Sequence, residues 1–245
     1  MKKIAVAFII LIALVSIYKY KNLSETKIVG LIVPHHDVAH RLTKEIFNKV
    51  NLNDFDSVII IGPNHYGIGG KEVVYSANKS IRNNSIDLSS LKNIDYDIQI
   101  KDSIFLKEHS IYEILKYTDN RKIVPIVLRS YFKKEKAEEL SEKIYKAIEN
   151  KSVLIIASVD FSHYLSIEEA YKKDKVTINL IEEKNYEEIY NLNADYLDSA
   201  PSLITFMKIM DFAKLEGKLV GHSNSYDEGV GRSDLTTSYL TYIFE

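Results

Sequence analysis

Cysteine and tryptophan are absent from this 245-residue chain, and proline and glycine are scarce, with four and nine residues. Without cysteine the chain can form no disulfide bond and no thiolate-ligated metal site, so any bound metal must use nitrogen and oxygen ligands. An excess of charge of one sign is also missing, because 32 basic residues nearly balance 34 acidic residues. The basic residues are scattered as well, and we therefore expect no nucleic-acid partner.

The N-terminus carries a signal-type segment, in which two lysines precede an unbroken apolar run from Ile4 to Val15. Its end lacks the small residues of an A-x-A-like cleavage site. We therefore expect an uncleaved membrane anchor through residues 4–18, within an anchor and tether at 1–26, followed by an extracytoplasmic domain at 27–245. A buried core helix is the alternative, but no amphipathic stripe interrupts the run.

Strand-like apolar runs and amphipathic helix-like segments alternate after this tether. The patterns predict strands at 28–33, 57–61, 122–128 and 152–157, and helices at about 37–50, 109–117 and 133–149. This alternation is typical of βαβ units, in which helices cover a parallel sheet. Since 46% of the residues are hydrophobic, a sizeable core can form. The sequence predicts one domain of the α/β class, a three-layer α/β/α fold with a mainly parallel central sheet.

Two further regions complete the expected fold. Between residues 67 and 102 the pattern weakens into short segments rich in asparagine and serine, which predicts a mobile loop or a small antiparallel insertion. Later in the chain we expect a helix that begins near Pro201 with Ser199 as its N-cap, followed by strands at 218–223 and 235–244.

Three predicted strands lead directly into a histidine-containing segment, and this is the clearest functional signal in the sequence. The histidines are His35, His65 and His163. Because the carboxyl ends of strands border the ligand crevice of an open α/β sheet, we expect these imidazoles to meet in one site. His35 rather than its neighbour His36 is expected to face the crevice, since adjacent residues of an extended chain point to opposite sides.

Other polar residues near the strand ends add candidates. His109 opens a predicted helix, where the helix dipole favours an uncharged ring. Asp160 and His163 are three residues apart and can converge if their segment turns helically. An imidazole with a carboxylate can bind a divalent metal, or can act without metal as a base and its orienting partner. A metal-free hydrolase using Asp160 and His163 therefore stays open, although no G-x-S-x-G, P-loop or G-x-G-x-x-G motif occurs.

The ordered set of these motifs resembles the Memo-like family, which includes AmmeMemoRadiSam system protein B. The resemblance covers most of the chain after residue 27, and its strongest members are G-P-N-H and S-x-D-F-S-H-Y. The matching segments are Pro34-His35, Gly62-Pro63-Asn64-His65-Tyr66, Glu108-His109-Ser110-Ile111, Pro125-Ile126-Val127-Leu128 and Ala157-Ser158-Val159-Asp160-Phe161-Ser162-His163-Tyr164.

This resemblance implies an α/β/α fold similar to the extradiol ring-cleaving dioxygenases, with a metal-binding crevice near the strand ends. It implies that His35 and His65 are metal ligands, and that three pocket-lining residues are His109, Asp160 and His163. The third ligand of the family is a cysteine four residues before a proline. In this chain Leu197 occupies that place before Pro201, and Asp198 is next to it.

Leucine cannot bind a metal, so three alternatives follow. Asp198 substitutes for the cysteine, or Asp160 or His163 completes the coordination sphere, or this branch has lost the metal. A carboxylate in place of a thiolate shifts the preference from Cu(I) toward iron(II), manganese or zinc. We predict His35, His65 and Asp198 as the ligands of a divalent metal.

The expected function is metal-dependent chemistry on a small substrate, either oxidative cleavage or hydrolysis. His109, His163 and Asp160 are the predicted catalytic acid/base residues. A noncatalytic peptide- or protein-binding module is the alternative from another class, because seventeen tyrosines supply material for an interface.

Overall fold

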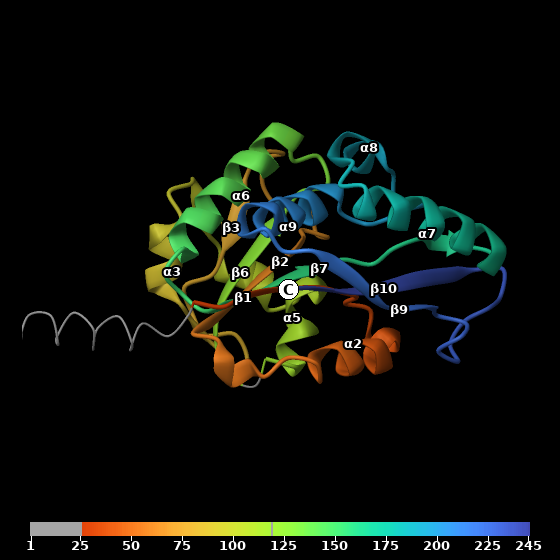
Figure 1. Ribbon diagram of the computed structural model, residues 1–245, viewed down its shortest axis with the longest axis horizontal. Coiled ribbons are helices and arrows are strands. Elements are labelled where there is room, and N and C mark those ends of the chain that lie inside the picture. The colour runs from red at the N-terminus through yellow and green to blue at the C-terminus, as the bar shows by residue number, and fades with distance from the viewer. Residues whose placement is uncertain (1–25, 119) are drawn as a thin grey trace, which may run out of the picture.

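The part of the chain that the computed structural model describes, residues 26–118 and 120–245, is built around a mixed sheet with helices on both faces (Figure 1). The strands are β1 (Ile28–Val33), β2 (Ser57–Pro63), β3 (Val74–Ser76), β4 (Ser85–Ile86), β5 (Ile98–Ile100), β6 (Lys122–Leu128), β7 (Val153–Ser158), β8 (His163–Leu165), β9 (Gly217–Asn224) and β10 (Thr236–Phe244). The α-helices are α2 (His40–Phe47), α3 (Leu88–Asn93), α4 (Asp102–Phe105), α5 (His109–Tyr112), α6 (Lys134–Ile148), α7 (Ile167–Glu182), α8 (Tyr186–Asn191) and α9 (Ala200–Ala213).

Four parallel strands form the centre of the sheet, in the order β6-β2-β7-β1. These are the four strands predicted from near-continuous apolar runs. Their sequences are almost entirely apolar because both of their faces are buried. In β1, Leu31 and Val33 belong to the core on one face and Ile32 to the core on the other. Alternate side chains along each strand therefore belong to two separate hydrophobic layers, one on each face of the sheet.

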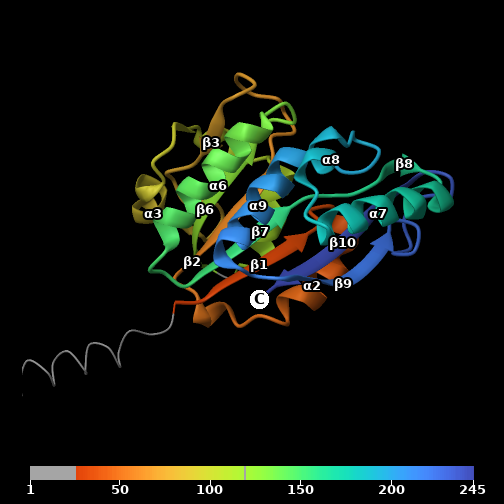
Figure 2. The ribbon, with the colours of Figure 1, turned by 45° about the horizontal axis from the view of Figure 1, so that its top comes forward.

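Helices enclose both layers. α6 and α9 pack against each other on one face, with α7 and α8 on the same side, while α2 and α5 cover the opposite face (Figures 1 and 2). The predicted start of α9 is confirmed, because the Ser199 side chain accepts a hydrogen bond from the backbone N–H of Ser202 and Pro201 lies in the first turn. The described residues thus form a single α/β domain.

The sheet is less parallel than the sequence suggested. Among the described residues, four of the nine strand pairings are antiparallel, because β10 runs against β1, β8 and β9, and β3 runs against β6. The predicted helices at 37–50 and 109–117 are also shorter and partly 3-10 helical, with 3-10 turns at Asp37–Ala39 and Ile114–Lys116. The region 67–102 contains three short strands and α3. The helices α7 and α8 were not predicted from the sequence pattern.

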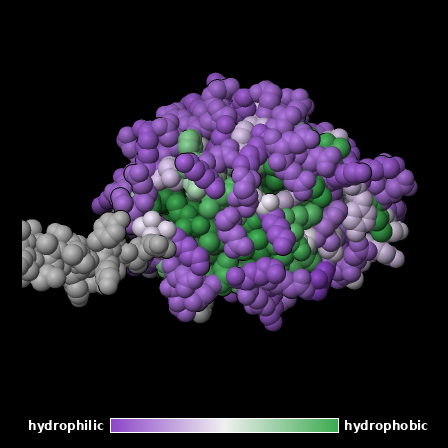
Figure 3. Space-filling model, in the orientation of Figure 1, coloured by the Kyte–Doolittle hydropathy of each residue, from purple (hydrophilic) through white to green (hydrophobic). Residues whose placement is uncertain are grey.

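The surface is dominated by polar residues on the face that Figure 3 shows. Hydrophobic residues gather near its centre, around the region where β10 ends in Figure 1, and hydrophilic residues surround them. The predicted membrane anchor at 4–18 lies outside the described residues. Within the residues that the structure does describe, no helix combines the length and apolar character that a membrane crossing needs.

Gly30 tests how tightly α9 is packed on β1. A Cβ atom there would overlap Sδ of Met210 and lie 2.8 Å from Cζ of Phe206, and both side chains are enclosed in the core. We expect Gly30→Ala to lower the free energy of unfolding by about 1–3 kcal/mol, the cost of overpacking a core. Urea denaturation measures this change.

Gly70→Ala is the matched control, because the atom nearest to its added Cβ would be Cγ2 of Val73 at 3.4 Å. Its effect should stay within about 0.5 kcal/mol, as for ordinary surface substitutions. Equal stability of the Gly30 and Gly70 variants would contradict the tight helix–sheet packing.

Candidate metal centre

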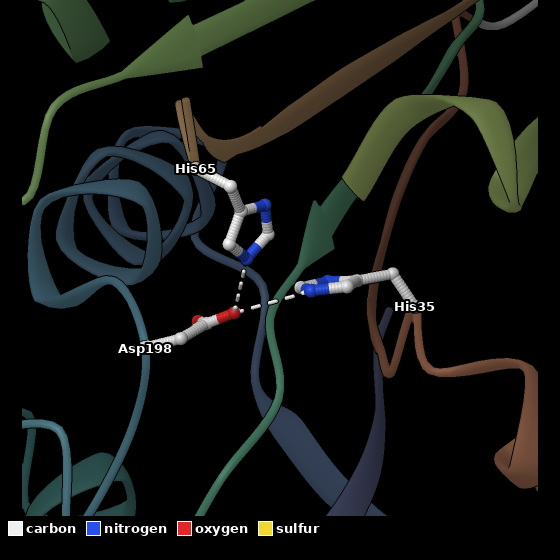
Figure 4. A group of neighbouring side chains, drawn as sticks. All are labelled: His35, His65 and Asp198. Carbon is white, nitrogen blue, oxygen red and sulfur yellow. Dashed lines mark ion pairs between the residues drawn. The ribbon is translucent and has the colours of Figure 1, made fainter. Parts of the chain in front are cut away.

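The carboxyl ends of the parallel strands deliver polar side chains to one place. His35, His65 and Asp160 each lie two positions after the last residue of β1, β2 and β7. Asp198 reaches the same place from the segment that precedes α9. Figure 4 shows His35, His65 and Asp198 pointing toward one another from these three separate segments.

His35, His65 and Asp198 converge through one atom each. Nε2 of His35 lies 3.2 Å from Oδ2 of Asp198, and Nε2 of His65 lies 3.6 Å from the same oxygen. Around a tetrahedral ion with bonds of about 2.0–2.2 Å, two ligand atoms are separated by about 3.3–3.6 Å. Both distances to Oδ2 of Asp198 are therefore close to those between two ligands of one metal ion, and all three atoms lie within 4.8 Å of one another.

Glu108 fixes the orientation of His65. This fully buried carboxylate accepts a hydrogen bond from Nδ1 of His65 at 2.6 Å and another from its backbone N–H at 3.0 Å. Ser110 holds the carboxylate in turn, because its backbone N–H donates to Oε1 of Glu108 at 3.4 Å. The Ser110 hydroxyl lies 3.2 Å from the same oxygen and 2.9 Å from the carbonyl of Pro63. With Nδ1 engaged in this way, Nε2 faces Asp198, and loss of its proton frees a lone pair for a metal, as in the carboxylate–histidine arrangements of metal sites.

His35 is held by a second set of contacts. Its Nδ1 lies 3.4 Å from the hydroxyl of Ser158, and its backbone N–H donates to Oδ1 of Asp160 at 3.0 Å. The backbone N–H of His36 donates to the same oxygen at 3.4 Å. Only 6% of the surface of His35 is exposed, whereas His36 is exposed and contacts the hydroxyl of Tyr239. Both residues line the pocket at the strand ends, so the expectation that only one of the pair faces it is not met.

A β-bridge between two backbone segments positions Asp198 in the site. Phe161 and Leu197 form an antiparallel bridge, and the N–H of Asp198 donates to the carbonyl of Asp160 at 3.1 Å. Leu197 is buried in the hydrophobic core, so the next side chain points the other way, into the crevice. Of the three alternatives for the missing cysteine, the geometry favours Asp198.

The electrostatics of the site favour a cation. Burial of the ring lowers the pKa of His65, but the Asp198 and Glu108 carboxylates outweigh burial and raise it to about 10. Both oxygens of Asp198 are shielded from solvent. Oδ2 has the two histidine Nε2 atoms beside it, whereas Oδ1 has no hydrogen-bond partner among the described residues. Unpartnered buried oxygens are costly, and a metal ion between Asp198 and the two histidines removes that cost. The nitrogen and oxygen donors therefore fit a divalent ion.

A pocket of about 870 Å³ opens onto these residues. Its rim carries the exposed side chains of Tyr66 and Tyr164, and His109 is also exposed on its wall. Apolar side chains of Val230 and Leu235 line another part. The pocket thus joins a polar end at the candidate ligands to a partly apolar wall, which suits a small organic molecule.

Asp160 and His163 also meet Asp198, but not in the way the sequence suggested. Their segment does not turn helically, because His163 begins strand β8. One ligand atom from each of the three residues nevertheless lies within 4.8 Å of the others. Nδ1 of His163 is buried and has no hydrogen-bond partner among the described residues.

A buried carboxylate behind the pocket supports this segment. Asp174 of α7 is fully buried and accepts hydrogen bonds from the hydroxyls of Ser162 and Ser238, each at 2.6 Å. Nε2 of His222 lies 2.7 Å from its other oxygen. Because Ser162 separates Asp160 from His163 along the chain, Asp174 helps to set the position of both.

Comparisons with known proteins identify the family of the chain. A family model described as "Memo-like protein" matches residues 11–243. The chain belongs to the Memo-like family. A MEMO1 family protein of Methanobrevibacter smithii is 31% identical to this Memo-like protein over 243 residues, covering 89% of this chain and 83% of the relative. Another, from Aquifex aeolicus, is 25% identical over 238 residues, covering 88% and 85%.

A solved structure shares the fold. The crystal structure of the uncharacterized protein JW3007 from Escherichia coli K12 matches this Memo-like protein with a TM-score of 0.63. The match covers 89% of this chain and 99% of that chain at 9% sequence identity. At this identity the likeness concerns the fold alone.

Two supporting residues were missed by the sequence reasoning. Glu108 gave a weak signal as the residue before a predicted helix, and it does cap α5, since its side chain accepts from the N–H of Ser110. Nothing in the sequence indicated its contact with His65, which is 43 residues away. Asp174 gave no signal at all, because α7 itself was not predicted.

Replacing Glu108 tests the support of His65. Glu108→Gln keeps the shape of the side chain but removes its charge, so the Nδ1 hydrogen bond weakens. We expect the affinity for Zn²⁺ or Mn²⁺ to fall about 10–100-fold, the usual cost of disturbing such a partner. Competition titration with a chelating dye measures the change. Glu45→Gln on the exposed face of α2 is the control, and equal affinities in both variants would contradict the role of Glu108.

The raised pKa of His65 also predicts a pH dependence. Below about pH 10 the ring of the metal-free protein holds a proton that a metal ion must displace. Metal affinity should therefore rise with pH, by up to about tenfold per unit from this one proton, and fall as the solution is acidified. Isothermal titration in buffers of different ionisation enthalpy counts the released proton, and a pH-independent affinity would contradict this assignment.

Proposed function

We propose that this Memo-like protein is a metal-dependent enzyme that acts on a small organic substrate. The observation that carries the proposal is the convergence of Nε2 of His35, Nε2 of His65 and Oδ2 of Asp198 at the bottom of the pocket. Three protein ligands leave coordination positions open, which is typical of catalytic rather than structural metal sites. The pocket of about 870 Å³ has the size of a small-molecule site.

The ligand set supports particular metals and reactions. Two histidines and one carboxylate suit iron(II), zinc or manganese, and this combination is the one that many iron(II) oxygenases use. When bound, such an ion supplies a Lewis acid that polarises a substrate oxygen. A metal held by two histidines and one carboxylate can support either oxidative cleavage or hydrolysis. Measuring turnover with and without oxygen distinguishes the two reactions.

The remaining polar residues supply proton transfer in this proposal. His109, on the exposed wall of the pocket, is available as an acid or base. The acid/base roles predicted for Asp160 and His163 stay predictions. The metal-free hydrolase that uses this pair predicts activity that survives a chelator, so an ester and amide screen in chelator tests it.

Membrane attachment through residues 4–18 and an extracytoplasmic domain also stay proposals from the sequence. The noncatalytic binding module finds partial support in the exposed Tyr66 and Tyr164 at the rim. The convergence of His35, His65 and Asp198 beside that rim favours the metal-dependent enzyme.

Metal content after purification tests the proposal. We expect His65→Ala and Asp198→Asn to reduce metal affinity by more than about 100-fold, beyond the effect of changing a supporting residue. Asp195→Asn is the matched control, because Asp195 also lines the pocket but lies outside both candidate ligand groups. Elemental analysis gives the occupancy. A wild-type protein without metal affinity, or full occupancy in both ligand variants, contradicts the proposed function.

A further inference from the structure

We infer that the pocket binds two divalent metal ions, with Asp198 bridging them. The first ion is held by His35 and His65, as in the proposed function on which this inference rests. The second is held by Asp160 and His163. The sharing of Asp198 between two groups of candidate ligands, and the unpartnered buried atoms in both groups, point to this second site.

The five side chains fall into two overlapping groups, and Nε2 of His35 also lies 3.5 Å from Oδ2 of Asp160. His35, His65 and Asp198 lie within 4.8 Å of one another through one atom each, and so do Asp160, His163 and Asp198. The two groups share Asp198 but no histidine. A carboxylate has two oxygens and about four lone-pair positions, so Asp198 can bind one cation through each oxygen.

The atoms of the second group are free to bind. Oδ1 of Asp160 accepts from the backbone N–H groups of His35 and His36. Its other oxygen, Oδ2, lies 3.5 Å from Nε2 of His35 and is available to a cation. Nδ1 of His163 and Oδ1 of Asp198 are both shielded from solvent and have no hydrogen-bond partner among the described residues. A cation between these atoms satisfies all three.

The charge of the site supports two ions. The carboxylates of Glu108, Asp160 and Asp198 are all largely buried around the two histidines. Among the described residues that line the pocket there is no lysine or arginine. One divalent ion neutralises two of the three negative charges, and a second ion, with two positive charges, more than compensates the third. Buried charge without a counter-charge is strongly unfavourable.

The sequence explains how one carboxylate, that of Asp198, can lie between two metal ions. With Leu197 in the core, the crevice receives a carboxylate, which can bind two cations at once through separate oxygens. Pairs of metal ions in enzymes lie about 3.5–4 Å apart, a separation that one carboxylate group can span. In this arrangement Asp160 and His163 are ligands, so His109 is the one of the three predicted acid/base residues that is left for proton transfer.

The experiment measures Mn²⁺ stoichiometry in the full, untagged chain. The metal-free protein is loaded with Mn²⁺, dialysed, analysed for metal and examined by electron paramagnetic resonance. We expect about two ions per chain and an exchange-coupled spectrum in the wild type. We expect about one ion and an uncoupled spectrum in both His163→Ala and Asp160→Asn.

Asp160→Asn keeps an oxygen that can accept the backbone N–H groups of His35 and His36, so it provides a second variant if His163→Ala fails to fold. The ion that remains in either variant shows that the first site is intact. His40→Ala is the control, because His40 lies on exposed α2 and contacts Tyr117 instead of the pocket. It should keep both ions.

The outcomes separate this inference from the proposed function. One ion in the wild type, unchanged in His163→Ala but lost in His65→Ala, overturns the second site and leaves the first. Two ions that persist in His163→Ala and Asp160→Asn also overturn it, since the second ion then binds elsewhere. Loss of both ions from these variants contradicts separate ligand sets, and no binding in the wild type overturns both proposals.

Discussion

The burial of carboxylates beside imidazoles is the interaction around which the pocket is organised. Glu108 is fully buried against His65, and Asp198 lies between His65 and His35. Removing such groups from water costs free energy unless a positive partner compensates their charge. In the metal-free state a proton on His65 provides part of that compensation. A metal ion provides more of it, which is why the same residues that hold the pocket together are suited to bind one.

The architecture of the sheet explains how these charged side chains come together. Ends of parallel strands bring backbone groups and short connections to one edge, where side chains from distant parts of the sequence meet. β1, β2 and β7 are rigid, because both of their faces are covered by apolar layers. Polar support then comes from outside the strands, through Glu108 before α5 and Asp174 in α7. The ends of β1 and β2 fix the positions of the candidate ligands His35 and His65. Glu108, which precedes α5, and Asp174, in α7, are the carboxylates that support the site.

Asp198 shows how one residue's direction depends on its neighbours. The sequence places a leucine where the family has a cysteine, and it leaves open which residue replaces the lost ligand. The bridge between Phe161 and Leu197 favours Asp198, because Leu197 is buried in the core and Asp198 lies beside the histidines. That bridge joins segments 36 residues apart, so no local pattern could reveal it. His163 is similar, since it reaches Asp198 from a strand and not from the helical turn expected.

The sequence by itself determined the four central strands, the capped start of α9 and the histidines that follow β1 and β2, because these features depend on local periodicity and on the burial of continuous apolar runs. It also determined that a metal could be bound only by nitrogen and oxygen, since no cysteine is present. Only the tertiary structure decided the antiparallel additions to the sheet, the contact of Glu108 with His65 and the approach of Asp198 to both histidines. These depend on pairing between residues far apart in the chain, where many registers satisfy the same local pattern and the packing of the whole domain selects one.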